Sequence, residues 1–166
     1  MTVFLLRHGQ TRGNLERRYT GSTDEPLCPQ GKAELEGVRP PEAEYVYVSP
    51  MIRCRETAEI LYPGMEQMAV PGFRETGFGI FEGHTYEELK ETHAYRAWLD
   101  TAGAVPPPGG ESKAAVRQRV TEAFLALAAG HGPEDRVALV VHGGTIMTLL
   151  EAFEASGRFY DWQPPN

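Results

Sequence analysis

Short apolar runs along the chain predict four β-strands. Residues 2–6 (TVFLL) and 136–141 (RVALVV) are runs in which apolar residues do not alternate with polar ones. Continuous runs of this kind are typical of strands that are covered on both faces. Residues 45–48 and 65–70 are shorter candidates. The pattern predicts that 2–6 is a buried strand and that 136–141 is a central strand of a parallel sheet.

Segments with helical spacing of apolar residues alternate with these strands. Apolar side chains that recur every three or four residues lie on one face of a helix. The pattern predicts helices at residues 29–37, 50–61, 86–99, 112–130 and 144–155. In the third of these, the residues expected broadly on one side are Leu89, His93, Trp98 and Leu99. Because strands and helices alternate, we expect an α/β domain with a mostly parallel sheet.

The composition fits one folded domain. The chain has 166 residues, of which 41% are hydrophobic, so it can bury a core without disulfide or metal cross-links. No linker divides it, and we expect one domain over residues 1–166. No apolar stretch is long enough to span a bilayer, and the first residues lack the features of a signal peptide. Two cysteines, Cys28 and Cys54, fit a reducing compartment, so the predicted location is the cytoplasm.

The charge of the chain is negative overall but positive near its start. The net charge of −7 argues against nucleic acid or an anionic membrane as a partner. Residues 1–18 hold four arginines against the single Glu16, a net charge of +3, so the remaining residues carry −10. The arginines are Arg7, Arg12, Arg17 and Arg18. Such a cluster suggests a small anion site, although charge alone also fits a solvated basic end.

Two segments lead from a predicted strand into a histidine and a glycine. They are FLLRHGQT, which contains His8, and LVVHGGTI, which contains His142. The carboxyl ends of parallel strands line one crevice, so both histidines are expected to open onto it. Glycine lets the backbone approach a ligand closely, and a helix beginning after His142 would let the amides of Gly143 and Gly144 face an anion. Together these features predict an anion-binding site.

The segment around the first histidine, RHGQTRGN, closely resembles the RHG signature of the histidine phosphatase superfamily, which includes the cofactor-dependent phosphoglycerate mutases. Five further segments match motifs of that family in its order and, with the first, cover nearly the whole chain. They are YTGSTDEPLCPQGKAE, SPMIRCRETAE, RETGFGIFEG, PGGES and VHGGTI. The resemblance implies a three-layer α/β/α sandwich with a mostly parallel central sheet flanked by helices. Relatives commonly continue into a last strand after the segment matching residues 159–163, so this chain is expected to lack that strand.

The resemblance implies that His8 is the nucleophile and forms a phosphohistidine. Neutral imidazole is a competent nucleophile near neutral pH, because its unperturbed pKa is ~6.5. By the same resemblance, Arg7 and Arg53 would hold phosphoryl oxygens and disfavour protonation of His8. His142 would hold a further oxygen and stabilise the transition state, with the Gly143 amide beside it. The residues assigned to the phosphate or the adjoining part of the substrate are Gln10, Asn14, Thr20 and Gly21.

The resemblance also implies a general acid, and the sequence favours chemistry without a metal. Glu75 would protonate the leaving alcohol and then deprotonate the attacking water. Glu82 is a rival, but the resemblance makes it structural. No metal or cofactor is expected, because His84, His93 and His131 lack the spacing of metal ligands. The arginines expected to be solvent-facing or structural are Arg12, Arg17, Arg18 and Arg55.

Hydrolysis of a small phosphorylated metabolite is the predicted activity. The segments GFGIFEG, PPGGES and RFYDWQ are most similar to the α-ribazole-phosphatase-type branch, so α-ribazole 5'-phosphate is a candidate substrate. Phosphoglycerate mutase activity is the alternative, but mutases typically carry an insertion over the site for which this chain is short. A protein phosphohistidine phosphatase and a non-catalytic phosphate-binding regulatory module are further alternatives, and the intact site residues argue against the module. A homodimer stays open as the assembly.

Overall fold

The computed structural model describes residues 1–153, and within this range the strands form one parallel sheet. The strands are β1 (Thr2–Arg7), β2 (Tyr45–Val48), β3 (Gln67–Ala69) and β4 (Arg136–Val141). Their order in the sheet is β1-β4-β2-β3. The predicted central position of residues 136–141 is therefore confirmed: β4 pairs with a parallel strand on each side.

Helices alternate with the strands along the described chain. The longer ones are α2 (Pro29–Glu36), α3 (Ile52–Leu61), α5 (His93–Asp100), α6 (Lys113–Ala128) and α7 (Gly143–Phe153). The shorter ones are α1 (Arg12–Leu15), α4 (Tyr86–Leu89) and the 3₁₀ helices η1 (Pro71–Phe73) and η2 (Gly79–Phe81). The apolar pattern does not reveal α1, because a polar capping box between Thr11 and Asn14 starts it.

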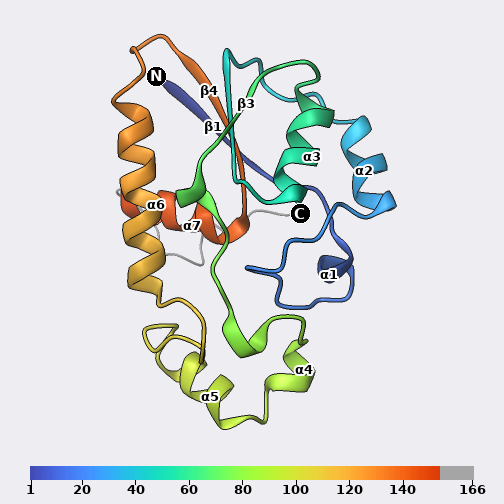
Figure 1. Cartoon of the computed structure of the whole chain (residues 1–166), viewed down its shortest axis with the longest axis vertical. Helices are drawn as coiled ribbons and strands as arrows, with labels where there is room; N and C mark the ends of the chain where they lie inside the picture. The colour runs from blue at the N-terminus through green and yellow to red at the C-terminus, as the bar shows by residue number, and fades with distance from the viewer. Residues whose placement is uncertain (154–166) are drawn as a thin grey trace.

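The two faces of β4 pack into separate cores. Val137, Leu139 and Val141 pack in one core with residues of α6 and α7. Ala138 and Val140 pack in the other with residues of α3. Successive side chains of a strand point to opposite faces, so a strand between two helical layers must be apolar throughout. Figure 1 shows α6 and α7 on one side of the sheet and α3 and α2 on the other, which is the predicted three-layer sandwich.

β1 is less buried than its apolar pattern predicts. Thr2 is exposed, and the other residues of β1 are only half-buried. In the described part of the chain β1 pairs with β4 alone and lies at an edge of the sheet. Val3 and Leu5 still pack against the core of α6 and α7, and Leu6 packs against that of α3. The apolar run of β1 reflects that both of its faces are covered, but it does not indicate that β1 lies at an edge of the sheet.

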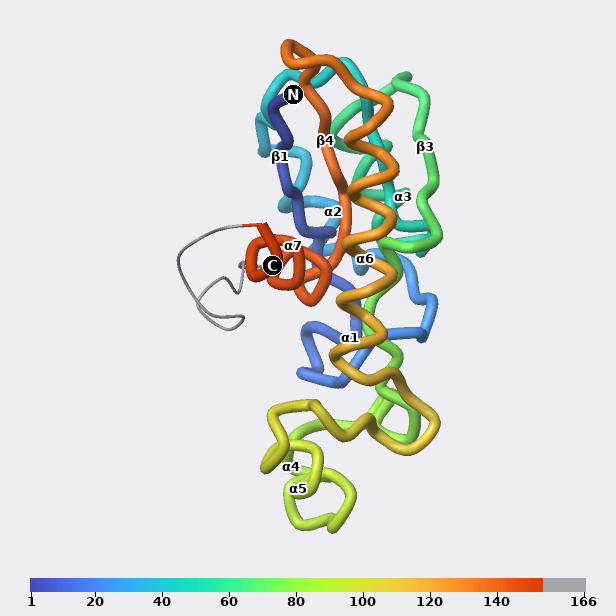
Figure 2. The backbone as a smooth tube through the Cα atoms, turned by 90° about the vertical axis from the view of Figure 1, so that its left-hand side faces the viewer, coloured from blue at the N-terminus to red at the C-terminus, as the bar shows by residue number. Residues whose placement is uncertain are grey.

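The single helix predicted at residues 86–99 is wrong, because the segment forms two helices, α4 and α5. The side chain of Thr92 accepts a hydrogen bond from the backbone of α5 and caps its start, which ends the helical run before it. The pair buries Leu89, whereas His93 and Leu99, expected on the same side, are exposed. Figures 1 and 2 show both helices at one end of the molecule, beyond the carboxyl ends of the strands.

Two expectations from the sequence concern the end of the chain. The helix predicted at 144–155 is present as α7, which is described as far as Phe153. The expectation that a final strand is lacking lies outside the described residues. In residues 1–153, no helix combines the length and the apolar character needed to cross a membrane.

We expect Leu139→Ala to destabilise the protein by about 2–5 kcal/mol, because Leu139 is fully buried and its truncation leaves a cavity beside β4. Urea unfolding followed by circular dichroism measures the change. The matched control is Leu125→Ala on α6, where the side chain is 56% exposed and the expected change is within about 0.5 kcal/mol. Equal effects of the two substitutions would contradict the core assigned to β4.

Candidate active site

Three strands end at the same level of the sheet, and a polar residue follows each of them. His8 follows β1, Ser49 follows β2 and His142 follows β4. The backbone pairing continues past the strands, because His8 N donates to Val141 O at 3.0 Å. Ser49 N likewise donates to Val140 O at 3.0 Å. The ring centroids of the two histidines are 5.1 Å apart. The structure therefore brings both rings together at the carboxyl ends of the strands, as the strand pattern predicts.

The ring of His8 is oriented by a hydrogen bond to the backbone. Its Nδ1 lies 2.7 Å from Gly9 O, and a carbonyl oxygen can only accept, so Nδ1 carries the proton. The lone pair of the neutral ring is therefore on Nε2. Burial, with the charges of Arg53 and Arg7, lowers the pKa of His8 to about 3. His8 is thus a neutral imidazole with Nε2 as its nucleophilic atom.

His142 has a partner at each ring nitrogen. Arg53 Nε donates to His142 Nδ1 over 3.3 Å, so Nδ1 accepts and Nε2 carries the proton of the neutral ring. His142 Nε2 then donates to Ser49 Oγ at 2.7 Å. Burial and the nearby charge of Arg53 hold the pKa of His142 well below its usual value. This ring is therefore a neutral hydrogen-bond donor held in one orientation.

Two arginines place positive charge beside the histidines. Arg53, on α3, is 1% exposed, and its Nη1 and Nη2 donate to Thr23 O at 2.8 Å and Gly21 O at 2.9 Å. The fork assigned to phosphate by resemblance thus also holds the loop after α1. Arg7 lies against the start of α7, where a Cβ added at Gly143 would be 3.4 Å from Arg7 Cζ. Four charged or ionisable groups from distant parts of the sequence therefore converge here.

The carboxylate of Glu75 is held at the first turn of α7. Its Oε2 accepts from Gly144 N at 3.1 Å, and its Oε1 accepts from Thr76 N at 2.8 Å. A Cβ at position 144 would collide with Glu75 Oε1, so only glycine lets the carboxylate come this close. The sequence predicted that the amides at the start of this helix face an anion. In this structure the Gly144 amide donates its hydrogen bond to an anion of the protein itself, the carboxylate of Glu75.

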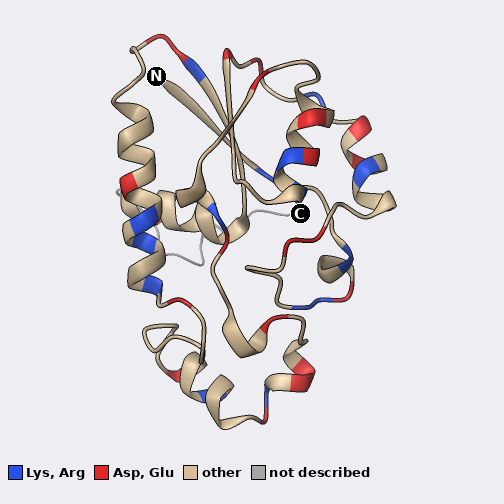
Figure 3. Cartoon of the chain, in the orientation of Figure 1, with Lys and Arg blue, Asp and Glu red and all other residues tan. Residues whose placement is uncertain are grey.

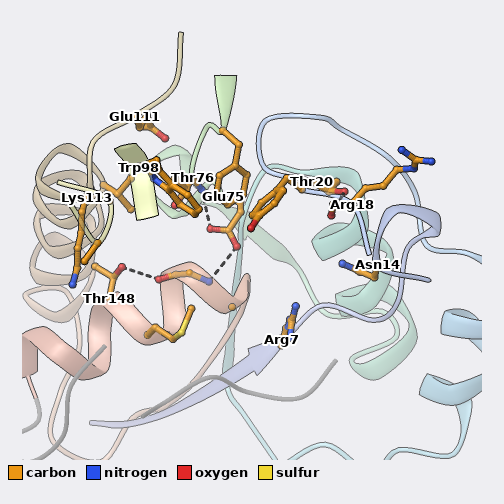
Figure 4. Close-up of a pocket in the computed structure, with 18 of the residues that line it drawn as sticks. Arg7, Asn14, Arg18, Thr20, Glu75, Thr76, Trp98, Glu111, Lys113 and Thr148 are labelled. Carbon is orange, nitrogen blue, oxygen red and sulfur yellow. Dashed lines mark hydrogen bonds between the residues drawn. The ribbon is translucent and has the colours of Figure 1, made fainter. Parts of the chain in front are cut away.

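A cavity of about 480 Å³ adjoins these groups. The residues predicted for the site that line it are Arg7, Asn14, Thr20, Glu75 and Gly143. Those predicted residues that are not among its described lining are His8, Gln10, Gly21, Arg53 and His142. Figure 4 shows Arg7 and Glu75 on facing sides of the space. The arrangement combines a cavity lined by the carboxylate of Glu75 with a buried imidazole, His8, that is 5% exposed.

The family described as histidine phosphatase superfamily (branch 1) matches residues 3–163. The chain belongs to this superfamily. Its members are enzymes, phosphatases or mutases, so the recognition made from the motifs is confirmed at that level.

Relatives of both kinds resemble this histidine phosphatase superfamily member. It is 30% identical to the 2,3-bisphosphoglycerate-dependent phosphoglycerate mutase of Brucella ovis, over 92% of this chain and 81% of the relative. Its structure matches a phosphoglycerate mutase from Thermus thermophilus with a TM-score of 0.75 and 34% identity, covering 95% and 87% of the two chains. It matches the alpha-ribazole phosphatase from Shigella flexneri with a TM-score of 0.84 and 25% identity, covering 95% and 81%.

The outer residues assigned by resemblance lie in different environments in this superfamily member. Asn14 and Thr20 line the cavity, and Asn14 Oδ1 also accepts from Thr11 N at 3.1 Å. Gly21 contributes its backbone: its amide donates to the Glu82 carboxylate, and its carbonyl oxygen accepts from Arg53. Gln10 contributes its carbonyl oxygen, which accepts from Cys28 N at 2.9 Å. Gly21 and Gln10 thus use their backbones to hold the loops of the site in place.

Glu82, the rival acid, binds the same loop as Arg53, the one that contains Gly21 and Thr23. Its carboxylate accepts hydrogen bonds from the backbone or hydroxyl groups of Gly21, Ser22, Thr23 and Phe78. Burial alone would raise the pKa of Glu82, but these hydrogen bonds outweigh it and lower the pKa. An ionised carboxylate that accepts from so many donors is a structural anchor.

Several cavity residues were not predicted from the sequence. Arg17 and Arg18, expected to be solvent-facing or structural, line the cavity, although Arg18 also pairs with Glu16 at 2.6 Å. Glu111, in the PGGES segment, lines it too. Ser49 was missed as the partner of the second histidine, and the signal was there: it follows a predicted strand as both histidines do.

The described part of the chain offers no cluster of metal ligands. In residues 1–153, no three or more His, Cys, Asp or Glu side chains form a group that could hold a metal ion.

The unfolding free energy should depend on pH through His8. The folded-state pKa is lowered to about 3, whereas an imidazole in the unfolded chain titrates near ~6.5. The stabilising difference is present above about pH 6.5 and is lost as the pH falls towards 3, because only the unfolded state binds the proton. In His8→Gln, the fall in unfolding free energy between pH 7 and pH 5 should be smaller by about 1–2 kcal/mol.

Urea unfolding at the two pH values measures this difference. The matched control is His93→Gln, which changes an exposed histidine and should leave the wild-type pH dependence in place. A His8→Gln curve that falls as steeply as the wild-type curve would show that this ring is protonated in the folded protein.

Proposed function

We propose that this protein is a phosphatase that hydrolyses a small phosphorylated metabolite through a phosphohistidine at His8, without a metal ion or cofactor. The observation that carries the proposal is the hydrogen bond from His8 Nδ1 to Gly9 O, which leaves the Nε2 lone pair for attack on phosphorus. The neighbouring Arg7, Arg53 and His142 would stabilise the negative charge of the phosphoryl group in flight.

The reaction would proceed in two steps. His8 Nε2 forms a bond to phosphorus while the bond from phosphorus to the ester oxygen breaks, and protonated Glu75 gives its proton to that oxygen. The carboxylate then takes a proton from water, whose oxygen attacks the phosphohistidine, and the P–N bond breaks. Phosphate leaves, and both residues return to their starting state. Glu75 lines the cavity, which supports this role, and two backbone amides fix the position of its carboxylate there.

The walls of the cavity favour hydrolysis over mutase chemistry. Tyr19, Phe78 and Trp98 form an aromatic wall, in which the rings of Tyr19 and Trp98 are perpendicular at 5.9 Å. Two cations at the cavity, Arg18 and Lys113, pair with Glu16 and Glu151, whereas Arg17 also lines it, so the aromatic rings rather than a shortage of cations carry this preference. These features support an alcohol with an apolar surface.

A candidate of that kind is α-ribazole 5'-phosphate, the phosphate ester of a heteroaromatic riboside. The name of the alpha-ribazole phosphatase from Shigella flexneri suggests it, since that structure matches with a TM-score of 0.84. Mutase activity is the second candidate, because the mutase relatives are 30% and 34% identical to this chain over the aligned residues. The proposed setting is the cytoplasm, as the two thiols and the small metabolite suggest.

Brief incubation with an aryl phosphate that carries ³²P, followed by denaturation, should leave an acid-labile, base-stable label on the protein. His8→Ala should carry no label, because it lacks the nucleophile. His93→Ala, at an exposed histidine, is the control and should be labelled like the wild type. Label persisting in His8→Ala would move the nucleophile to another residue.

With 3-phosphoglycerate and its bisphosphate as substrates, we expect release of inorganic phosphate to be faster than formation of 2-phosphoglycerate. The aromatic wall is the physical reason, because apolar rings provide poor anchorage for a second anionic group. Measuring both products in one time course makes the comparison. Isomerisation outpacing phosphate release would reverse the assignment in favour of a mutase.

A further inference from the structure

Arg119 on α6 is an extensively bonded side chain near the site, although the cavity lining does not include it. Its Nε and Nη2 each donate to the Glu111 carboxylate at 2.8 Å. Its Nη1 donates to Gly72 O at 2.9 Å and to Arg74 O at 2.7 Å, and its Nη2 also donates to Glu75 O at 3.1 Å. A guanidinium has five N–H donors in a rigid fork, and these five hydrogen bonds match that number.

The partner carboxylate, Glu111, holds the same segment from its other end. Glu111 Oε2 accepts from Gly77 N at 2.9 Å, and Glu111 N donates to Gly77 O at 2.8 Å. Burial alone would raise the pKa of Glu111, but the hydrogen bonds and charge of Arg119 outweigh it and lower the pKa. Glu111 is therefore an ionised anchor, although it lines the cavity beside Glu75.

The segment held in this way carries the proposed acid and has no regular structure of its own. Residues 74–78 lie between η1 and η2 and form neither helix nor strand. Just beyond them, Gly79 has φ +54°, and a Cβ there would collide with Pro108 O, so this backbone packs directly on the turn before Glu111. The position of the Glu75 backbone is therefore set by side chains of α6 and of the turn that precedes it.

The two helices that bind Glu75, α6 and α7, pack in the same hydrophobic core. Val116 and Val120 of α6 and Ile146 of α7 pack with β4 in one hydrophobic cluster. α6 carries Arg119, and α7 carries the Gly144 amide that donates to the Glu75 carboxylate. The backbone and the side chain of Glu75 are thus positioned by two helices packed on one face of the sheet. Figure 3 shows the basic residues of α6 gathered in the half of the helix that lies towards α5.

We propose that Arg119, braced by Glu111, is a positioning residue that sets the location of the proton donor Glu75 in the cavity. The inference rests on the proposed role of Glu75. Lysine cannot replace the arginine, because a single ammonium group cannot bind three carbonyls and two carboxylate oxygens in a plane. A carboxylate misplaced by about 1 Å can cost on the order of a hundredfold in rate. The loss should affect both proton transfers assigned to Glu75, and only the first of them depends on the leaving group.

The test compares kcat and KM for an alkyl phosphate, whose leaving group needs a proton, with those for 4-nitrophenyl phosphate, whose leaving group does not. We expect Arg119→Lys to lower kcat/KM for the alkyl ester by about ten- to a hundredfold, through kcat rather than KM. The kcat/KM of the aryl ester should change little, because this ratio covers the steps up to departure of the leaving group and not the later attack of water. The matched control is Arg117→Lys on the same helix, which pairs with Glu151 at 3.7 Å and should leave both rates unchanged.

Two further variants keep the proposal falsifiable. Glu111→Gln keeps the size of the side chain that pairs with Arg119 and should show the same selective loss. This variant provides the test if Arg119→Lys does not fold. Glu75→Gln should show the selective loss at full size, and adding Arg119→Lys to it should cause no further loss. Equal losses of kcat/KM on the two esters, or an additive loss in the double variant, would overturn the positioning role. A Glu75→Gln variant without any selective loss would instead refute the proposed acid.

Discussion

The parallel pairing of β4 with β1 and β2 is the constraint on which the rest of the site depends. It brings His8, Ser49 and His142 to one level, because each follows the last paired residue of its strand. The backbone hydrogen bonds of His8 N and Ser49 N to β4 extend that register into the site itself. In a strand, a shift by one residue turns every side chain to the opposite face. The hydrophobic cores on both faces of β4 therefore hold the register, and the register sets the relative positions of His8, Ser49 and His142.

Burial gives the two imidazoles their chemical character. Both rings lie out of water beside arginines, so the neutral form of each is favoured and the pKa of each is lowered. The hydrogen bonds of His8 to Gly9 O and of His142 to Arg53 and Ser49 then select different tautomers for the two rings. One ring presents a lone pair at Nε2 and the other presents a proton at Nε2. Two residues of one type thus differ in which ring nitrogen carries the proton through their neighbours alone.

Three glutamates near the cavity show the same dependence on environment. Glu82 and Glu111 each bind several donors, their pKa values are lowered, and each holds a loop in place. Glu75 binds two backbone amides and faces the cavity. The superfamily to which the chain belongs contains both mutases and phosphatases. In this chain the two histidines follow the ends of strands, whereas the aromatic wall, built partly from Trp98 of α5, lies outside the sheet.

The sequence by itself determined the alternation of strands and helices, the central place of β4, the pair of histidines and the family. These features depend on local periodicity and on short motifs, both of which are properties of neighbouring residues. Only the tertiary structure decided the edge position of β1, the break at Thr92, the direction of the Arg53 fork and the contacts of Arg119. Each of these depends on a partner distant in the sequence or on competition between a side chain and the backbone for one hydrogen bond. Residue patterns along the chain do not record which distant groups meet, because that is set by packing of the whole fold.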